Sequence, residues 1–437
     1  MPEARLSWES IPWNRICPWL RVTRLFWIAA DPRKLVLATC GLLLMSLAQE
    51  AGEALLSTGE PQPSSEATVS GPVWPWETRL GYDLWQTDDP LGEVGLWFVD
   101  PRGTLGRLAS NWQVVLRPLD FLLIPLRSLG ELPAPTPRWL STSVALLTGT
   151  LIWAVFGGAI GRMAAVNFAR DQQVSLFGSL RFSISHLPGY LAGPLLPLSG
   201  MGLCLGATTL AALIARIPDV GPLVVAVGWG LALIGGFAMV VLLLGLAAGW
   251  PLMIATVNVE GSDGFDGFSR AYNYTFERPW YYLFLTALVM TYGSLVIFFF
   301  WLCGQLMFRL SGLGLLAGAG AEITRELFTS MPPLLAAESW GEFAPTQAGT
   351  ILGIWARVVA TLVVAFVYSY FWSATTVIYF LLRRSVDSSD FNEVHLDTHA
   401  EPDPLLPIVG TAAMNPAPPV PAAAPPAGSR PPIDLTP

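Results

Sequence analysis

The sequence has few charged residues and almost no lysine. Only 13% of its 437 residues are Asp, Glu, Lys or Arg, and lysine occurs once, at Lys34. A soluble protein of this length would carry roughly 25% charged residues. The chain has no dense basic patch, which argues against a nucleic-acid partner. The 53% hydrophobic content therefore needs an explanation other than an ordinary soluble core.

The residue patterns of common catalytic and metal sites are also missing. The chain has three histidines and four cysteines, and none of them forms an HExxH or CxxC pattern or another His/Cys spacing that suits zinc. No GxSxG element is present. The predicted spans contain almost no ionisable residues, which catalysis inside a membrane normally requires. We therefore predict no catalytic, cofactor-binding or metal-binding residue, and we favour a non-enzymatic protein.

What the chain does contain is long apolar blocks, of which residues 231–250 are an example. About 20 apolar residues in a helix cross a hydrocarbon layer of about 30 Å. The blocks are continuous rather than alternating, which excludes a membrane β-barrel, and a helix satisfies its own backbone hydrogen bonds in lipid. The sequence predicts an all-α, polytopic transmembrane helical bundle of about six spans, with interfacial amphipathic helices and a disordered C-terminal tail.

Three segments follow from this pattern. Residues 1–34 are predicted to be a cytoplasmic interfacial segment, because arginines alternate with tryptophans there. Residues 383–437 are predicted to be a cytoplasmic, Pro/Ala-rich, disordered tail. Between them lies the transmembrane domain, 35–382. Its spans are expected near 35–56, 139–161, 187–215, 222–249, 280–308 and 351–382, with long non-cytoplasmic loops at 57–138 and 309–350.

Arginine placement predicts the orientation. Arginines cluster in the N-terminal segment, in the 162–186 and 258–279 loops and after the last span. With six spans these segments share one side, which the positive-inside rule assigns to the cytoplasm. We therefore expect a multi-pass protein of the bacterial inner membrane with both termini cytoplasmic. Five spans, or a re-entrant first block, would reverse the N-terminus.

Two of the loops on this side resemble each other. At a constant offset of 91 residues, Phe177 matches Phe268, Pro188 matches Pro279, and Tyr190 matches Tyr281. Each loop precedes a span and has aromatic or apolar residues at helical spacing, which is typical of a surface-lying amphipathic helix. Spans two and three would then form a parallel repeat with spans four and five; the alternative is that similar interfacial composition arose by coincidence.

Glycines recur at a spacing that suits helix packing. Three GxxxG pairs lie in or at the edge of the predicted spans, at 157–161, 202–206 and 245–249. Small residues let helices approach closely, so we expect these faces to pack inside one molecule. Residues 312–320 are also glycine-rich, but they lack the ending of a phosphate-binding loop. We predict that this segment is a flexible or interfacial loop.

Three stretches carry a resemblance: 27–37 (WIAADPRKLVL), 262–283 (SDGFDGFSRAYNYTFERPWYYL) and 373–397 (SATTVIYFLLRRSVDSSDFNEVHLD). Together they resemble a family of uncharacterised multi-pass inner-membrane proteins of planctomycete-type bacteria, with no known activity. The resemblance implies localisation and topology. Its recurrent segments fall at cytoplasmic helix ends, so the candidate functional residues are Asp263, Arg270, Arg278, Pro279, Arg383, Arg384 and Asp387.

Three functions remain open. The first is a structural or assembly component of the inner membrane, in contact with the lipid bilayer and with a membrane-protein partner or a second copy. The second is a transporter or permease subunit built on the parallel repeat, which requires a polar cavity between the repeat units. The third, an enzyme acting on lipids, would need clustered ionisable groups at one depth. We favour the first.

Overall fold

The structure is a computed structural model, and it describes residues 17–56, 74–78, 80, 102, 106, 111–130, 136–331 and 346–395. Contacts divide the chain into a unit of residues Met1–His395 and a second unit, Leu396–Pro437. All described residues belong to the first unit, and they form helices and connecting turns with no strand among them. The predicted tail beyond residue 395 and the first sixteen residues lie outside the described part.

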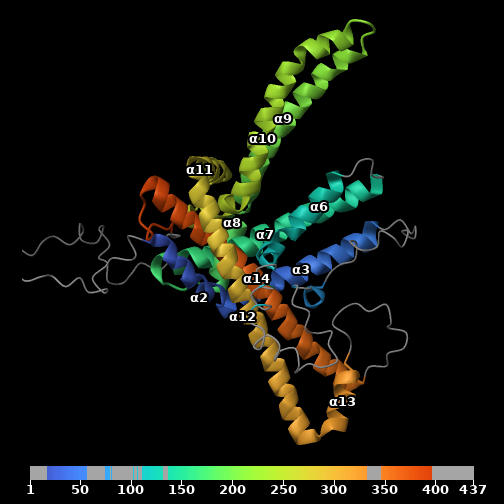
Figure 1. Ribbon diagram of the computed structural model, residues 1–437, viewed down its shortest axis with the longest axis vertical. Helices are drawn as coiled ribbons and strands as arrows, with labels where there is room; N and C mark the ends of the chain where they lie inside the picture. The colour runs from blue at the N-terminus through green and yellow to red at the C-terminus, as the bar shows by residue number, and fades with distance from the viewer. Residues whose placement is uncertain are drawn as a thin grey trace, which may run out of the picture. The chain divides into compact units, whose positions relative to one another are not determined.

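Six described helices are long and apolar enough to cross a membrane, which confirms the expected all-α bundle. They are α3 (Pro32–Leu56), α7 (Thr136–Arg170), α9 (Leu187–Ala212), α10 (Gly221–Glu260), α12 (Pro279–Ala319) and α14 (Gln347–Asp387) (Figure 1). A helix of 41 residues, such as α14, is about 60 Å long. This is about twice the thickness of the hydrocarbon layer. The longest helices therefore have room for both a membrane-crossing part and a part beyond it.

Shorter helices connect these six. They are η2 (Pro18–Arg24), α2 (Leu25–Ala29), η3 (Pro75–Glu77), η4 (Trp112–Leu119), α6 (Asp120–Gly130), α8 (Leu176–Ser185), η5 (Leu213–Arg216), α11 (Gly264–Glu277) and α13 (Ala321–Thr329). Side-chain caps explain where two of them begin: Ser175 accepts a hydrogen bond from the backbone of Gly178, and Asp263 accepts one from Asp266. Gly261, in the left-handed conformation (φ 62°), ends α10.

A similar arrangement occurs three times at one end of the molecule. Helices α2, α8 and α11 are short, and each leads into a long helix whose first or second residue is proline: Pro32, Pro188 and Pro279. Proline suits the first helical turn, where its missing N–H costs no hydrogen bond. The two loops that matched at the offset of 91 residues thus have the same local architecture. We call this end of the molecule, where α2, α8, α11 and the end of α14 lie, the arginine-rich end.

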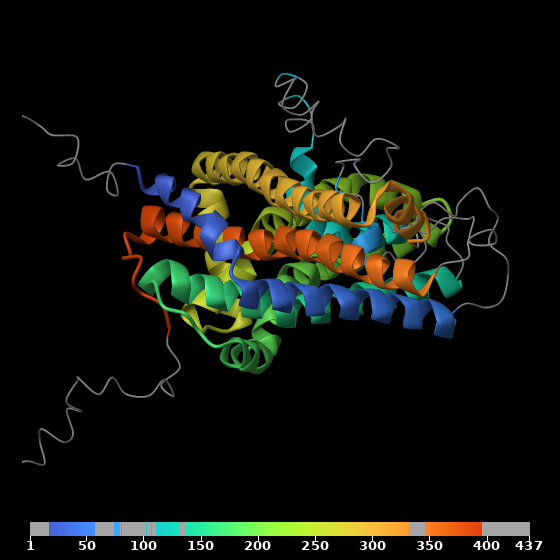
Figure 2. The same ribbon diagram turned by 90° about the horizontal axis from the view of Figure 1, so that it is seen from below.

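The core lies where α7, α10 and α14 meet near the arginine-rich end. Nearly every residue of α14 from Val363 to Leu382 is buried. α14 contacts α2, α3, α7, α10 and α12, and Figure 2 shows α3, α7 and α14 running side by side. Three indole rings fill the centre: Trp372 stacks on Trp153 and meets Trp250 edge to face. Aromatic side chains bury large areas, so this cluster contributes strongly to the packing.

Hydrogen bonds tie the first helices to this core. The sole lysine, Lys34, is fully buried, and its ammonium group donates to the carbonyl oxygen of Ile28 at 2.7 Å. This contact satisfies a carbonyl near the end of α2. Ser369 of α14 donates to the next carbonyl, that of Ala29, at 2.7 Å. The end of α2 is therefore hydrogen-bonded both to α3 and to the central helix α14.

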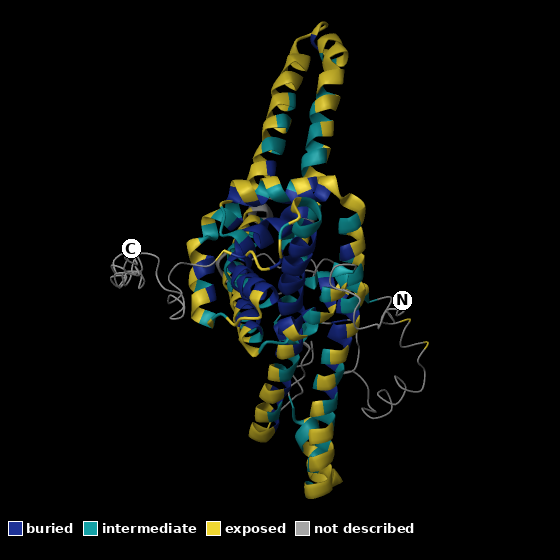
Figure 3. Ribbon diagram, turned by 90° about the vertical axis from the view of Figure 1, so that its left-hand side faces the viewer, coloured by how far each residue is buried: buried dark blue, intermediate teal, exposed yellow. Residues whose placement is uncertain are grey.

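The other parts of the long helices are exposed. α9 and α10 pack against each other as an antiparallel hairpin, but residues 222–244 of α10 are largely accessible (Figure 3). Val227 is 81% exposed, Leu231 is 76% exposed and Phe237 is 70% exposed. We call residues 198–244 the outer hairpin. Apolar side chains exposed on all sides are expected where helices face lipid or another membrane helix.

Two expectations from the sequence were wrong. Residues 312–320 are not a loop, because α12 continues as helix to Ala319 and ends at Gly320, whose φ is 87°. The tail does not begin at 383 either. α14 runs to Asp387, and the following residues pack against the core, with Phe391 4% and Val394 8% exposed. We call residues 388–395 the strap. Hydropathy missed it because a few apolar residues in a polar segment gave no periodic signal.

The three GxxxG pairs differ in their surroundings. At Gly161 an added Cβ would lie 2.2 Å from the Nδ2 atom of Asn258, and at Gly245 it would lie 2.2 Å from the ring of Tyr272. These two pairs pack inside the molecule, as expected. Gly202 and Gly206 have nothing within 4 Å, so the third pair faces open space on the outer hairpin.

Candidate functional site

The structure places the seven predicted residues at the arginine-rich end, but in different roles. Arg270 lies in α11, and Arg383, Arg384 and Asp387 lie in the last turns of α14. Asp263 caps α11 with a 3.0 Å hydrogen bond to the backbone of Asp266. The remaining two, Arg278 and Pro279, are the cap and first residue of α12, and both are exposed. Three of the seven, Arg270, Arg383 and Asp387, meet in one cluster.

The centre of that cluster is Glu260, the last residue of α10. Its side chain is 12% exposed, and its Oε1 atom lies 2.8 Å from Nη1 of Arg270 and 3.4 Å from Nε of Arg383. The hydroxyl of Tyr379 donates to the same oxygen at 2.5 Å. One carboxylate oxygen thus joins α10, α11 and α14. Charge-assisted hydrogen bonds of this kind are stronger than neutral ones.

Asp387 and Tyr274 extend the cluster. The hydroxyl of Tyr274 donates to Asp387, and Nη1 of Arg270 lies 3.9 Å from the same carboxylate oxygen. Burial and then the hydrogen bond to Asp387 raise the pKa of Tyr274 above its ordinary value of 10.0. Burial, the largest single cause, lowers the pKa of Arg270, but Glu260, Tyr274 and Tyr379 together outweigh it, and the pKa is raised. The phenol therefore stays neutral and the guanidinium charged. We call Glu260, Arg270, Tyr274, Tyr379, Arg383 and Asp387 the carboxylate cluster.

Arg383 also holds the strap. Its Nη1 donates to the carbonyl of Glu393 at 2.8 Å, and its Nη2 lies 3.2 Å from the Glu393 carboxylate. Two residues later, the backbone N–H of His395 donates to the carbonyl of Val259 at 2.9 Å. An added Cβ at Gly261 would lie 2.5 Å from the His395 ring. The strap therefore crosses the end of α10 so closely that only glycine fits beneath it.

A second polar group surrounds Arg162 of α7, which is 4% exposed. Its guanidinium donates to the carbonyl of Asn258 at 2.8 Å and to that of His395 at 2.5 Å, and lies 4.1 Å from the ring centroid of Phe182. The hydroxyl of Tyr190 donates to Oδ1 of Asn258 at 2.7 Å. Arg162 thus joins α7, α8, α10 and the strap. Such a buried polar network is stabilising when its members are satisfied.

Sequence reasoning missed Glu260, Tyr274, Tyr379, Arg162 and Asn258. Their partners are distant in the chain: Tyr379 and Glu260 are 119 residues apart, and Arg162 and Asn258 are 96 apart. One available signal was their position. Arg162, Glu260 and Tyr379 lie at or near the end of an apolar block, where a buried charge or phenol needs a partner.

The chemistry of this arrangement is that of a structural junction. The carboxylates of Glu260 and Asp387 are both engaged by guanidinium and phenol groups. Within the described ranges, no group of three His, Cys, Asp or Glu side chains is placed to hold a metal ion.

Comparison with known proteins gave no relative. No protein-family model matches the chain, and neither a curated protein nor a solved structure matches it.

Proposed function

We propose that this multi-pass membrane protein is a non-enzymatic structural or assembly component of the bacterial inner membrane, with the arginine-rich end in the cytoplasm. The observation that carries the proposal is a contrast between two regions. The helices of the arginine-rich end are packed and hydrogen-bonded to one another, whereas the outer hairpin packs against no other long helix that the structure describes. At the arginine-rich end, the carboxylate cluster and the packing of Trp153, Trp250 and Trp372 join the helices. The outer hairpin has apolar side chains exposed on all sides. Such a surface suits contact with another membrane helix.

The glycines of the outer hairpin support a helix partner over lipid alone. Gly202 and Gly206 of α9, and Gly228, Gly230 and Gly236 of α10, have nothing within 4 Å of an added Cβ. Helix pairs in membranes are enriched in small residues at their contacts, because the backbones then approach closely. Glycine also weakens a helix by about 0.5–1 kcal/mol relative to alanine. Open glycines at five positions are therefore costly unless another helix packs there.

The same packing makes a transporter the less favoured proposal. The alternative rests on similar architecture around α8 and α11, and it needs a continuous polar cavity between the two repeat units. The contact of α7 with α10 and α14 is instead filled by Trp153, Trp250 and Trp372, and Phe121 lies 6.0 Å from Trp250 between ring centroids. A filled aromatic centre favours a scaffold over a substrate path.

Site-specific photocrosslinking in intact membranes tests the proposed function. A photoreactive residue at Leu231, which is 76% exposed, should give a discrete crosslinked protein band, either with a partner or with a second copy. The same residue at Val257, which is 1% exposed, is the matched control on the same helix and should crosslink within the chain. Adducts with lipid alone at positions 203, 227, 231 and 237 would contradict the assembly role.

A further inference from the structure

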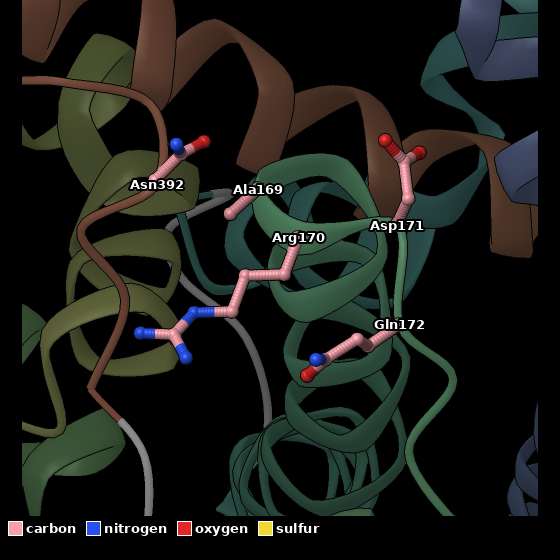
Figure 4. Close-up of a pocket in the computed structure, with 5 residues that line it drawn as sticks. All are labelled: Ala169, Arg170, Asp171, Gln172 and Asn392. Atoms are coloured by element: carbon pink, nitrogen blue, oxygen red, sulfur yellow. The ribbon is translucent and has the colours of Figure 1, made fainter. Parts of the chain in front are cut away.

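The arginine-rich end has an open hollow, lined by Ala169, Arg170, Asp171, Gln172 and Asn392 (Figure 4). In Figure 4 the carboxylate of Asp171 points away from the side chains of Arg170 and Gln172, and it forms an ion pair with Arg24 of η2. The hollow therefore presents a single guanidinium with two amide groups, which do not assemble a ligand site. The contacts that extend beyond this end of the molecule lie at the base of the outer hairpin.

Both helices that continue into the outer hairpin contain proline at its base: Pro194 and Pro197 in α9, and Pro251 in α10. Close contacts give the register of the two helices. An added Cβ at Gly193 would lie 3.4 Å from the Cβ of Met253, and one at Gly200 would lie 3.0 Å from Cδ1 of Leu242. Pro194 and Pro251 therefore stand at the same level, and Pro197 stands about one turn beyond it.

Proline weakens the helix backbone at this level. It has no N–H to donate to the carbonyl four residues earlier, and its ring clashes with that carbonyl, so sharp bends in helices occur at proline. The exposure of side chains changes at the same level (Figure 3): in α10, Trp250 is 6% exposed and Leu244 is 59% exposed. In α9, Pro197 is buried and Leu198 is 46% exposed. Both backbones are therefore weakened where the packed end passes into the outer hairpin.

Tyr272 of α11 contacts α10 on the hairpin side of Pro251. Its hydroxyl donates to the carbonyl of Leu242 at 2.5 Å. Tyr282 of α12 also donates to α10, at the carbonyl of Ala248 and at 2.6 Å, but this carbonyl lies within about one turn of Pro251. Bending at Pro251 moves the chain little there and more at Leu242. Tyr272 therefore restrains the direction of the outer hairpin more than Tyr282 does.

α11 holds the arginine-rich end with its opposite face. Arg270 and Tyr274 belong to the carboxylate cluster, and they bond to the end of α10 and to α14. Tyr272 lies midway between them in α11, so its side chain points to nearly the opposite side of a helix that turns once in about 3.6 residues. On that side, an added Cβ at Gly245 of α10 would lie 2.2 Å from the Tyr272 ring. One short helix thus joins the packed end to the outer hairpin.

We propose that Pro194, Pro197 and Pro251 form a hinge at the base of the outer hairpin, and that Tyr272 of α11 holds the hairpin in one direction. When the hydrogen bond from Tyr272 to Leu242 breaks, the hairpin swings about the prolines, while the tryptophan packing and the carboxylate cluster stay in place. A few residues that absorb the backbone change are enough for such a hinge. The hinge belongs to this chain alone, so it is tested separately from the assembly role.

Pulsed electron paramagnetic resonance on the full-length protein in lipid nanodiscs tests the hinge by measuring the distance between two spin labels. The native cysteines are replaced by serine, and the labels are attached at L231C in the outer hairpin and at S185C in α8, both at exposed positions. Residues 231–251 span about 30 Å of helix, so a bend of about 20° moves the hairpin label by about 10 Å. The distance distribution should therefore widen by about 10 Å in Y272A.

The matched control is Y292A. The hydroxyl of Tyr292 also donates to a backbone carbonyl, that of Thr23 at 2.9 Å, but away from the outer hairpin, so its removal should leave the distribution unchanged. Replacing the three prolines in P194A/P197A/P251A restores the helix N–H groups. Combined with Y272A, this triple change should narrow the distribution again.

An unchanged width in Y272A would overturn the proposal. So would a widening that the proline changes do not narrow, because the hairpin would then move about another point. A second label pair, S185C with E277C, lies within the arginine-rich end at exposed positions; widening of its distribution in Y272A would show that the packed end itself had loosened and would contradict a local hinge. If Y272A does not fold, Y272F removes the hydroxyl alone and should give a smaller widening, and no widening in Y272F would then overturn the proposal.

Discussion

The arginine-rich end and the outer hairpin are built from the same helix, α10, yet their surroundings are opposite. In its last turns, Leu252, Val257 and Val259 are 0–1% exposed. In its first turns, Val227 and Leu231 are more than three-quarters exposed. The exposed stretch is the more apolar of the two, because the buried end contains Thr256, Asn258 and Glu260, so hydropathy does not predict which stretch is buried in the protein. Polar contacts between helices are concentrated at the packed end; in the outer hairpin, Leu242 at its base accepts a hydrogen bond from Tyr272, and the other described side-chain hydrogen bonds stay within one helix.

The physical reason lies in how helices associate in lipid. Apolar side chains gain little by leaving lipid for each other, so association depends on close packing and on hydrogen bonds. The arginine-rich end has both, in the tryptophan packing and in the carboxylate cluster. The outer hairpin has open glycines instead. Three matched pairs of substitutions and one single substitution test this comparison, beginning with the largest expected effect.

Replacing Trp372 by alanine should give the largest loss of stability. Trp372 is 1% exposed and packs against Trp153 and Trp250. Truncating a buried tryptophan leaves a cavity and costs about 3–5 kcal/mol in free energy of unfolding. Trp229→Ala on the outer hairpin, where the ring is 58% exposed, should change it by less than about 0.5 kcal/mol. Unfolding in mixed detergent micelles, followed by tryptophan fluorescence, measures both; equal losses would contradict the comparison.

Glu260→Gln should cost less, because it keeps the shape of the side chain and removes its charge. Arg270 and Arg383 then lose the carboxylate that lies between them, and hydrogen bonds to charged groups contribute about 1.5–3 kcal/mol. Glu322→Gln, at an exposed position in α13, is the control. Limited proteolysis should also cut the strap sooner in Glu260→Gln, since Arg383 joins Glu260 to Glu393. Unchanged proteolysis together with unchanged stability would show that the cluster does not brace this end.

Gly161→Ala and Gly206→Ala should change stability in opposite directions. At Gly161 the new Cβ meets Asn258, whose side chain is held by Tyr190, so overpacking should cost about 1–3 kcal/mol. At Gly206 nothing lies within 4 Å, so the better helix former should add about 0.5–1 kcal/mol to the isolated protein. Thermal unfolding in detergent distinguishes the signs. The same sign at both positions would remove the distinction between the two GxxxG pairs.

Tyr274→Phe should have the smallest effect, and it should depend on pH. The folded-state pKa of Tyr274 is raised above 10.0. Its contribution to the free energy of unfolding is therefore complete below pH 10 and is lost as pH rises through the folded-state pKa. The reason is that the phenol ionises first in the unfolded state. Below pH 10 the variant should lose about 1 kcal/mol. Above pH 10 the wild type should lose stability more steeply than Tyr274→Phe; parallel stability curves would show that this phenol is not protected by folding.

The candidate site was only partly predictable. Arg270, Arg383 and Asp387 were singled out from stretches that recur at helix ends, and the structure places them within one cluster. Arg384 lies apart, over Phe391. Asp263, Arg278 and Pro279 serve as helix caps or starts. The sequence predicted at which end of the molecule these residues lie. It did not predict which charged side chains share a partner, because that depends on how α10, α11 and α14 are rotated about their axes.

By itself the sequence determined that the chain forms six long apolar helices with short helices at the arginine-rich end, because helix length and apolar content are local properties set by the thickness of a lipid layer. Only the tertiary structure decided which halves of those helices are buried, that Glu260 joins three helices, and that the strap packs where a free tail was expected. These features depend on side chains about 100 residues apart coming into hydrogen-bonding distance, and no local pattern encodes such a distance.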